Sequence, residues 1–169
     1  MSEPVCPVHI DVTIEEDSWP QEEELLVLAQ KAFAQAFLVA DLPIAPASEV
    51  SLVFTNDENI RVLNRQWREK DKPTNVLSFP GDEGDTLPFG PLLGDIVIAW
   101  ETVQRESREM AIPFLHHLTH LMIHGLLHLF DYDHMTSEEA EEMEQEERII
   151  LAALEIPDPY KDMPLHIDE

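Results

Sequence analysis

The pattern of apolar and polar positions divides the chain into alternating strands and helices. Residues 8–14 alternate between the two kinds, as a half-buried strand does, and residues 49–55 predict a second strand rich in Val and Phe. Between them, residues 22–38 carry apolar side chains at helical spacing. Further strands are predicted over residues 74–79 and 92–100, the latter interrupted near its start by the Gly94-Asp95 pair.

The remaining segments predict helices. Asn56 or Asp57 can cap a helix after the second strand. We expect its apolar residues to face the core and its arginines to share the opposite side; these are Ile60, Leu63 and Trp67, and Arg61, Arg65 and Arg68. A polar helix is expected over residues 101–110, and Pro113 opens another that runs to about Phe130.

The last predicted helix is acidic and begins at a cap provided by Thr136 or Ser137. Its run of glutamates between residues 138 and 147 is typical of a solvated helix face. The order of elements predicts an α+β fold, in which a small mixed sheet packs against several helices. At 169 residues, the chain is expected to form a single domain over residues 1–169.

Composition indicates a cytoplasmic protein. The single cysteine, Cys6, cannot form an internal disulfide. No basic and apolar leader is expected at the N-terminus, and the sequence contains no run of about 18 apolar residues, so no membrane association is predicted.

The formal charge of −25 argues against a protein that holds nucleic acid through a broad basic surface, because phosphate contacts require Lys and Arg. Half of the ten basic residues nevertheless lie between positions 61 and 72: Arg61, Arg65, Arg68, Lys70 and Lys72. Any RNA would therefore be bound locally and not over a broad surface.

Three histidines in the segment 124–134 (HGLLHLFDYDH) have the spacing of a catalytic metal site. His124 and His128 are four residues apart, which stacks their imidazoles on one face of a helix, and His134 in the following turn can close the site. His120 and His124 form a competing pair at the same spacing. The later register is favoured because the chain turns after Phe130.

Asp131 and Asp133 are possible oxygen ligands or acceptors that fix an imidazole tautomer. Three imidazoles on a divalent cation leave a position for water, whose pKa the metal can lower to about 7. In zinc peptidases the residue after the first His is the general base, but here it is Gly125, which argues against a peptidase. A glycine inside a helix indicates that a neighbouring strand or the substrate comes close to that backbone.

The segment 124–134 resembles the HGxLHLxGYDH signature of the YbeY family, which are bacterial single-strand endoribonucleases and rRNA maturation factors. The segments 63–80 (LNRQWREKDKPTNVLSFP) and 92–98 (LLGDIVI) are similar to two further family motifs in the same order. The chain departs from the signature at Asp131, where the family has Gly. Asp tolerates the left-handed conformation better than most residues, so the turn can persist, or Asp131 can enter the metal shell.

The resemblance implies that His124, His128 and His134 bind one zinc ion and that Arg68 is a catalytic residue of the cleft. An Arg beside a metal can stabilise the charge that develops on a cleaved phosphodiester, although a surface ion pair is the alternative for Arg68. Ser78 is expected either to line the cleft or to pack, and Asp95 to be structural. The nucleophile is left open between a metal-activated water and the 2′-hydroxyl of the RNA.

The implied function is a zinc-dependent endoribonuclease that cuts single-stranded RNA during maturation of the 3′ end of 16S rRNA and in ribosome quality control. Its implied partners are rRNA and the ribosome or small-subunit ribosomal proteins, with no role for DNA. The alternative is a metal-stabilised ribosome assembly factor that does not cut RNA.

Overall fold

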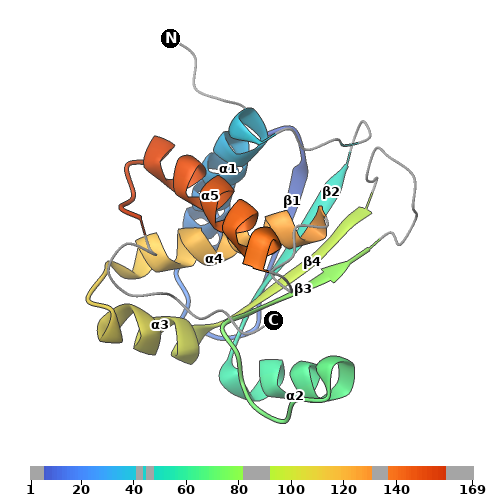
Figure 1. The fold of residues 1–169 in the computed structure, drawn as a ribbon. Coiled ribbons are helices and arrows are strands. Elements are labelled where there is room, and N and C mark those ends of the chain that lie inside the picture. Colours follow the sequence, from blue (N-terminus) through green and yellow to red (C-terminus); the bar gives the residue numbers. More distant parts are fainter. Residues whose placement is uncertain (1–5, 41–43, 45–47, 82–91, 131–136, 159–169) are drawn as a thin grey trace.

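The computed structural model describes residues 6–40, 44, 48–81, 92–130 and 137–158, which form four strands and five helices. Their order matches the alternation expected from the sequence (Figure 1). The strands are β1 (His9–Ile14), β2 (Glu49–Thr55), β3 (Val76–Pro80) and β4 (Leu92–Ala99). The helices are α1 (Glu22–Val39), α2 (Asp57–Arg68), α3 (Trp100–Glu109), α4 (Phe114–Leu129) and α5 (Ser137–Ala153).

The four strands form one mixed sheet in the order β1-β2-β4-β3. β1, β2 and β4 run parallel, and β3 pairs with β4 in the antiparallel direction, with Ser78 opposite Ile96. This confirms the predicted α+β class with a small mixed sheet. The expected interruption at Gly94 is a register shift in the pairing with β2, and Gly94 has a φ of 142° that favours glycine.

Alternation along β4 divides the core between the two faces of the sheet. Ile96 and Ile98 belong to the main core, which also contains residues of α1, α4 and α5. Val97 and Ala99 join a smaller cluster with Ile60 of α2. α2 therefore packs on one face of the sheet, and α4 lies on the other (Figure 1).

The sequence prediction for α2 is half correct. Asn56 caps the helix, as expected, because its side chain accepts a hydrogen bond from Asn59 N at 2.8 Å. Ile60 is buried, but Trp67, which was expected in the core, is 70% exposed. The helix ends at Glu69 in the left-handed conformation (φ 58°), so Trp67 lies in the last turn, beyond the apolar cluster under the helix.

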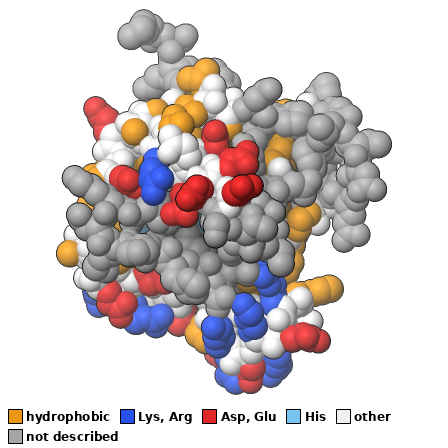
Figure 2. All heavy atoms as spheres, viewed as in Figure 1, with side chains coloured by type: hydrophobic (Ala, Val, Ile, Leu, Met, Phe, Trp, Pro, Cys, Tyr) orange, Lys and Arg blue, Asp and Glu red, His pale blue; other side chains and the backbone are white. Residues whose placement is uncertain are grey.

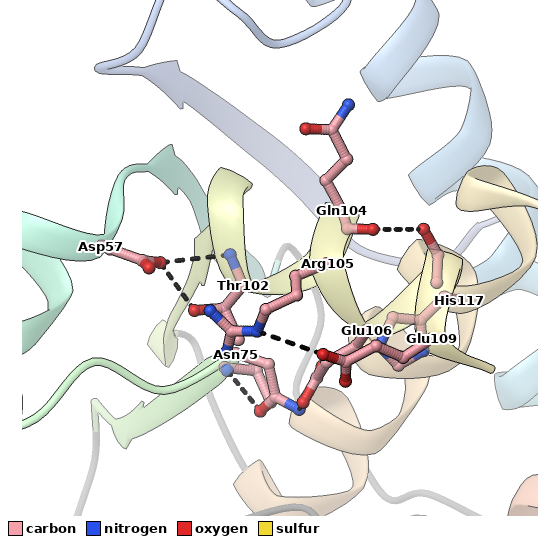
Figure 3. A network of polar contacts seen from close by, with 10 residues as sticks. Asp57, Asn75, Thr102, Gln104, Arg105, Glu106, Glu109 and His117 are labelled. Atoms are coloured by element: carbon pink, nitrogen blue, oxygen red, sulfur yellow. Dashed lines mark hydrogen bonds and ion pairs between the residues drawn. The ribbon is translucent and has the colours of Figure 1, made fainter.

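A polar network joins α3 to its neighbours (Figure 3). Asp57 at the start of α2 accepts a hydrogen bond from Thr102 Oγ1 at 2.6 Å. Glu106 accepts a hydrogen bond from Asn75 Nδ2 at 3.0 Å and lies 2.9 Å from His117 Nε2. These contacts tie α2, α4 and the start of β3 to α3.

Within the described segments, no helix is both long and apolar enough to cross a membrane. The predicted caps of the last helix involve Thr136, which lies outside the described residues, and Ser137, at which α5 begins.

Candidate metal and RNA site

α4 brings two of the three predicted metal ligands together. His124 is buried and His128 half-buried, with ring centroids 4.7 Å apart and ring planes 72° from parallel. One helical turn separates them, so both imidazoles lie on the same side of the helix. This side of α4 faces α5, where Glu147 contacts His124.

The third predicted ligand, His134, lies outside the described residues, as do Asp131 and Asp133. Within the described part of the chain, no group of three or more His, Cys, Asp or Glu side chains has an arrangement suited to a metal. The structure therefore supplies two histidines of the predicted set.

Glu147 of α5 is a site residue that the sequence prediction missed. The glutamate run was expected to be a solvated face, but Glu147 is fully buried, which makes that prediction wrong at this position. Its Oε1 lies 2.7 Å from Nδ1 of His124 and 3.3 Å from Nε2 of His120. The signal was present in the sequence, because Met143 and Ile150, which are also buried, place position 147 on the apolar stripe of α5.

The charge state of this cluster follows from its contacts. Burial opposes ionisation of Glu147, but His120 and His124 outweigh this effect and hold the pKa of its carboxyl well below its ordinary value. Burial lowers the pKa of His120, against the opposing effect of Glu147. An ionised Glu147 beside a neutral His120 satisfies both directions.

This arrangement fits a metal-binding histidine. If Nδ1 of His124 donates to the carboxylate, Nε2 is the nitrogen that can bind a metal, and the carboxylate fixes both tautomer and ring orientation. His120, which forms the competing pair with His124, has a different role in the structure, because its Nε2 is directed at Glu147. His117, one turn earlier, is directed at Glu106.

Gly125 lies between the two histidines and is in close contact with the sheet. A Cβ at this position would meet Cγ2 of Ile96 at 2.8 Å and Oγ of Ser78 at 3.1 Å. Ser78 Oγ also donates a hydrogen bond to the Gly125 carbonyl oxygen at 3.0 Å. A neighbouring strand is therefore the reason for a glycine here, and Ser78 anchors β3 to α4 at the level of the histidines.

Arg68 ends α2 and is half-buried. Among the described residues it forms no ion pair, unlike Arg61, whose Nε lies 2.8 Å from Asp71 Oδ1. The structure shows no contact between Arg68 and the histidines of α4, since the two helices pack on opposite faces of the sheet. β3, the last strand in the order of the described sheet, lies against both: Ser78 contacts α4, and Phe79 contacts Trp67 of α2.

Charge is distributed unevenly over the molecule. Figure 2 shows acidic side chains gathered over α5 and most of the basic side chains on the same face over α2 and α3. The basic cluster predicted between positions 61 and 72 thus lies on and just after α2.

Comparison with known proteins supplies the family context. A family model described as Endoribonuclease YbeY matches residues 11–155. A protein of Agrobacterium fabrum named Endoribonuclease YbeY is 54% identical over 164 residues, covering 92% of this chain and 96% of that protein. One of the same name from Sinorhizobium fredii is 50% identical over 163 residues, covering 92% and 93%.

A protein from Thermotoga maritima, whose structure was determined in solution, has the same fold. It aligns with a TM-score of 0.53 at 23% identity, covering 93% of this chain and 99% of that chain.

Proposed function

Because this chain belongs to the endoribonuclease YbeY family, and is therefore a nuclease that hydrolyses RNA, we propose that it cuts single-stranded RNA with one bound zinc ion. In this proposal His124, His128 and His134 hold the metal. The observation that carries it is the 2.7 Å contact between Glu147 and Nδ1 of His124. Metal-binding histidines almost always have such a partner on the other ring nitrogen.

Glu147 and Ser78 have distinct roles in this mechanism. A bound zinc ion would supply Lewis acidity and lower the pKa of a bound water. Glu147 retains the proton on Nδ1 of His124, so the imidazole keeps its metal-binding tautomer. Ser78 holds the backbone between the two histidines against β3, which limits the movement of their rings.

Arg68 is the proposed catalytic cation. Arg68 is half-buried as a residue and its guanidinium has no ion-pair partner among the described residues, so it is available to a phosphate group. A planar Arg fork can bind two non-bridging oxygens and stabilise the negative charge that develops on them during cleavage.

The nucleophile is either water or the 2′-hydroxyl adjacent to the scissile phosphate. Attack by the hydroxyl produces a cyclic phosphate, whereas attack by water leaves a linear one. End-group analysis of the first cleavage product, with a 2′-O-methyl substrate as the control, distinguishes the two routes. A substrate blocked at the 2′ position is cut only if water is the nucleophile.

The proposed biological substrate is the 3′ end of 16S rRNA, processed in the cytoplasm on the ribosome or with small-subunit ribosomal proteins. The charge of −25 supports reliance on such partners, because it predicts a weak grip on free RNA. Cleavage should be slow on naked rRNA and faster on ribosomal particles. Equal rates on both substrates would contradict this part of the proposal.

Metal dependence is tested by removing and restoring the ion. Protein stripped with a chelator should lose cleavage of a labelled single-stranded rRNA fragment and regain it on addition of about one equivalent of zinc. Circular dichroism before and after stripping shows whether the fold persists. If the stripped protein remains folded and cuts as before, the activity does not need a metal.

A further inference from the structure

Trp67 is exposed where the apolar pattern of α2 placed it in the core. Its side chain is 70% exposed, although tryptophan is among the side chains with most to gain from burial. Its ring packs edge-on against Phe79 of β3, with centroids 6.4 Å apart and planes 67° from parallel. This contact supports the ring from the side of the sheet and leaves most of it open to solvent.

The charges on the helix that carries Trp67 are favourable for an anionic partner. Arg65 and Arg68 belong to the same helix, α2, and neither forms an ion pair among the described residues. Arg61, nearer the start of the helix, is already paired with Asp71. An exposed aromatic ring on a helix that also carries arginines is suited to a chain that offers flat apolar rings and phosphates.

Trp67 is also close, through β3, to the side of the sheet that carries the histidines. Adjacent side chains of a strand point to opposite faces, and here Ser78 is bonded to Gly125 while Phe79 contacts Trp67. β3 is the last strand in the order of the described sheet. An RNA strand that crosses this edge would pass from the aromatic pair to the α4 side within a few nucleotides.

We propose that Trp67 is a stacking platform for an unpaired base of the RNA substrate, with the basic cluster on and just after α2 attracting the phosphates of the same strand. This inference rests on the proposed single-strand nuclease function. It assigns the exposed face of α2 to RNA and not to a protein partner, because the basic cluster between positions 61 and 72 lies on this helix and in the segment just after it.

The test combines a change in the protein with a change in the RNA. Binding of a short fluorescent 2′-O-methyl RNA is measured by anisotropy at low salt, which strengthens phosphate contacts. Trp67→Ala should weaken binding by about 5- to 150-fold, which corresponds to the loss of one stacked base, and Trp67→Phe should restore most of it. Leu38→Ala, which truncates another exposed apolar side chain, should leave binding unchanged.

Abasic substitution then identifies the stacked nucleotide. Removal of the base at one position should weaken binding to the wild type but not to Trp67→Ala, because the same contact is already lost. If every abasic RNA loses the same affinity for both proteins, Trp67 does not stack a base and the inference is overturned.

Two other outcomes also contradict it. If Trp67→Ala binds RNA as the wild type does but loses binding to ribosomal proteins, the surface is a protein contact. If the wild type does not bind the RNA even at low salt, Trp67 does not hold an RNA base and the inference is overturned. Cleavage and its zinc dependence are recorded on the same wild-type sample, so failure of this inference is separable from failure of the nuclease proposal.

Discussion

At the scale of single residues, Glu147 is the most consequential side chain outside the histidines. A buried carboxylate without partners would be costly, and here two imidazoles compensate it. The pairing connects α5 to α4 at the position where the metal is proposed. We therefore expect Glu147 to affect metal affinity more than it affects the fold.

Glu147→Gln is predicted to weaken zinc binding by about 10- to 100-fold, because the neutral amide holds Nδ1 of His124 less strongly. Competition with a chromophoric chelator measures the affinity directly, without RNA. Glu142→Gln, an exposed change on the same helix, is the matched control. Equal zinc affinity for Glu147→Gln and the wild type would show that the carboxylate is not a positioning group.

Gly125→Ala is predicted to destabilise the protein. Alanine would gain about 1 kcal/mol of helix propensity over glycine. However, its Cβ would meet Ile96 at 2.8 Å, and overpacking of this kind costs roughly 1–3 kcal/mol.

Urea unfolding measures the net effect of Gly125→Ala. The exposed pair Gln145→Gly and Gln145→Ala reports the propensity contribution alone. A Gly125→Ala protein more stable than the wild type would mean that the strand does not press on this position.

At the scale of elements, the sequence predicted what local patterns determine. Residues 49–55 were predicted and observed as a strand, and the cap at Asn56 was predicted and observed. Glu147 was misassigned because its place on the apolar stripe of α5 was overlooked, and Trp67 because its burial depends on which elements pack together. Helical periodicity gave Trp67 a buried position, but the apolar cluster under α2 ends before its last turn.

The candidate site could be predicted only in part for the same reason. Spacing showed that His124 and His128 share a helix face, but it fitted His120 and His124 equally well, and the turn expected after Phe130 was needed to favour the later pair. Glu147 lies on another helix, and nothing in the local sequence indicates which imidazole it contacts. Arg68 was assigned by resemblance, and its place opposite α4 across the sheet is a property of the topology.

Glu106 is predicted to stabilise the fold, because it links α3 to both α4 and the residue just before β3. Glu106→Ala would leave the buried side chains of Asn75 and His117 without their acceptor, at a cost of roughly 1–3 kcal/mol. Chemical denaturation measures this loss. Glu109→Ala, which removes only an exposed pair with Arg105, should change stability little, and equal effects of the two changes would contradict the network's role.

At the scale of the whole molecule, the dominant property is the charge of −25, with acid over α5 and base on α2 (Figure 2). Such a distribution repels RNA at long range and attracts it locally. The proposed need for ribosomal partners and the stacking role of Trp67 both follow from this balance. Partners would supply placement, and an uncharged contact would add affinity that salt does not screen.

Neutralising acid on α5 should therefore speed RNA association. The triple change of Glu138, Glu141 and Glu142 to Gln removes three exposed negative charges. Stopped-flow measurement should show faster binding than the wild type at low salt, and the difference should shrink as salt screens the repulsion. A rate unchanged at low salt would indicate that the acidic surface lies away from the path of the RNA.

Metal-dependent RNA cleavage is tested most directly with a labelled single-stranded rRNA fragment and protein of known metal content, comparing the wild type, His128→Ala and Arg68→Ala. We expect the wild type to carry about one zinc and to cut, His128→Ala to lose both metal and cleavage, and Arg68→Ala to retain the metal but cut poorly. Equal residual cleavage by all three proteins would contradict this expectation, because the activity would then come from neither the metal site nor Arg68.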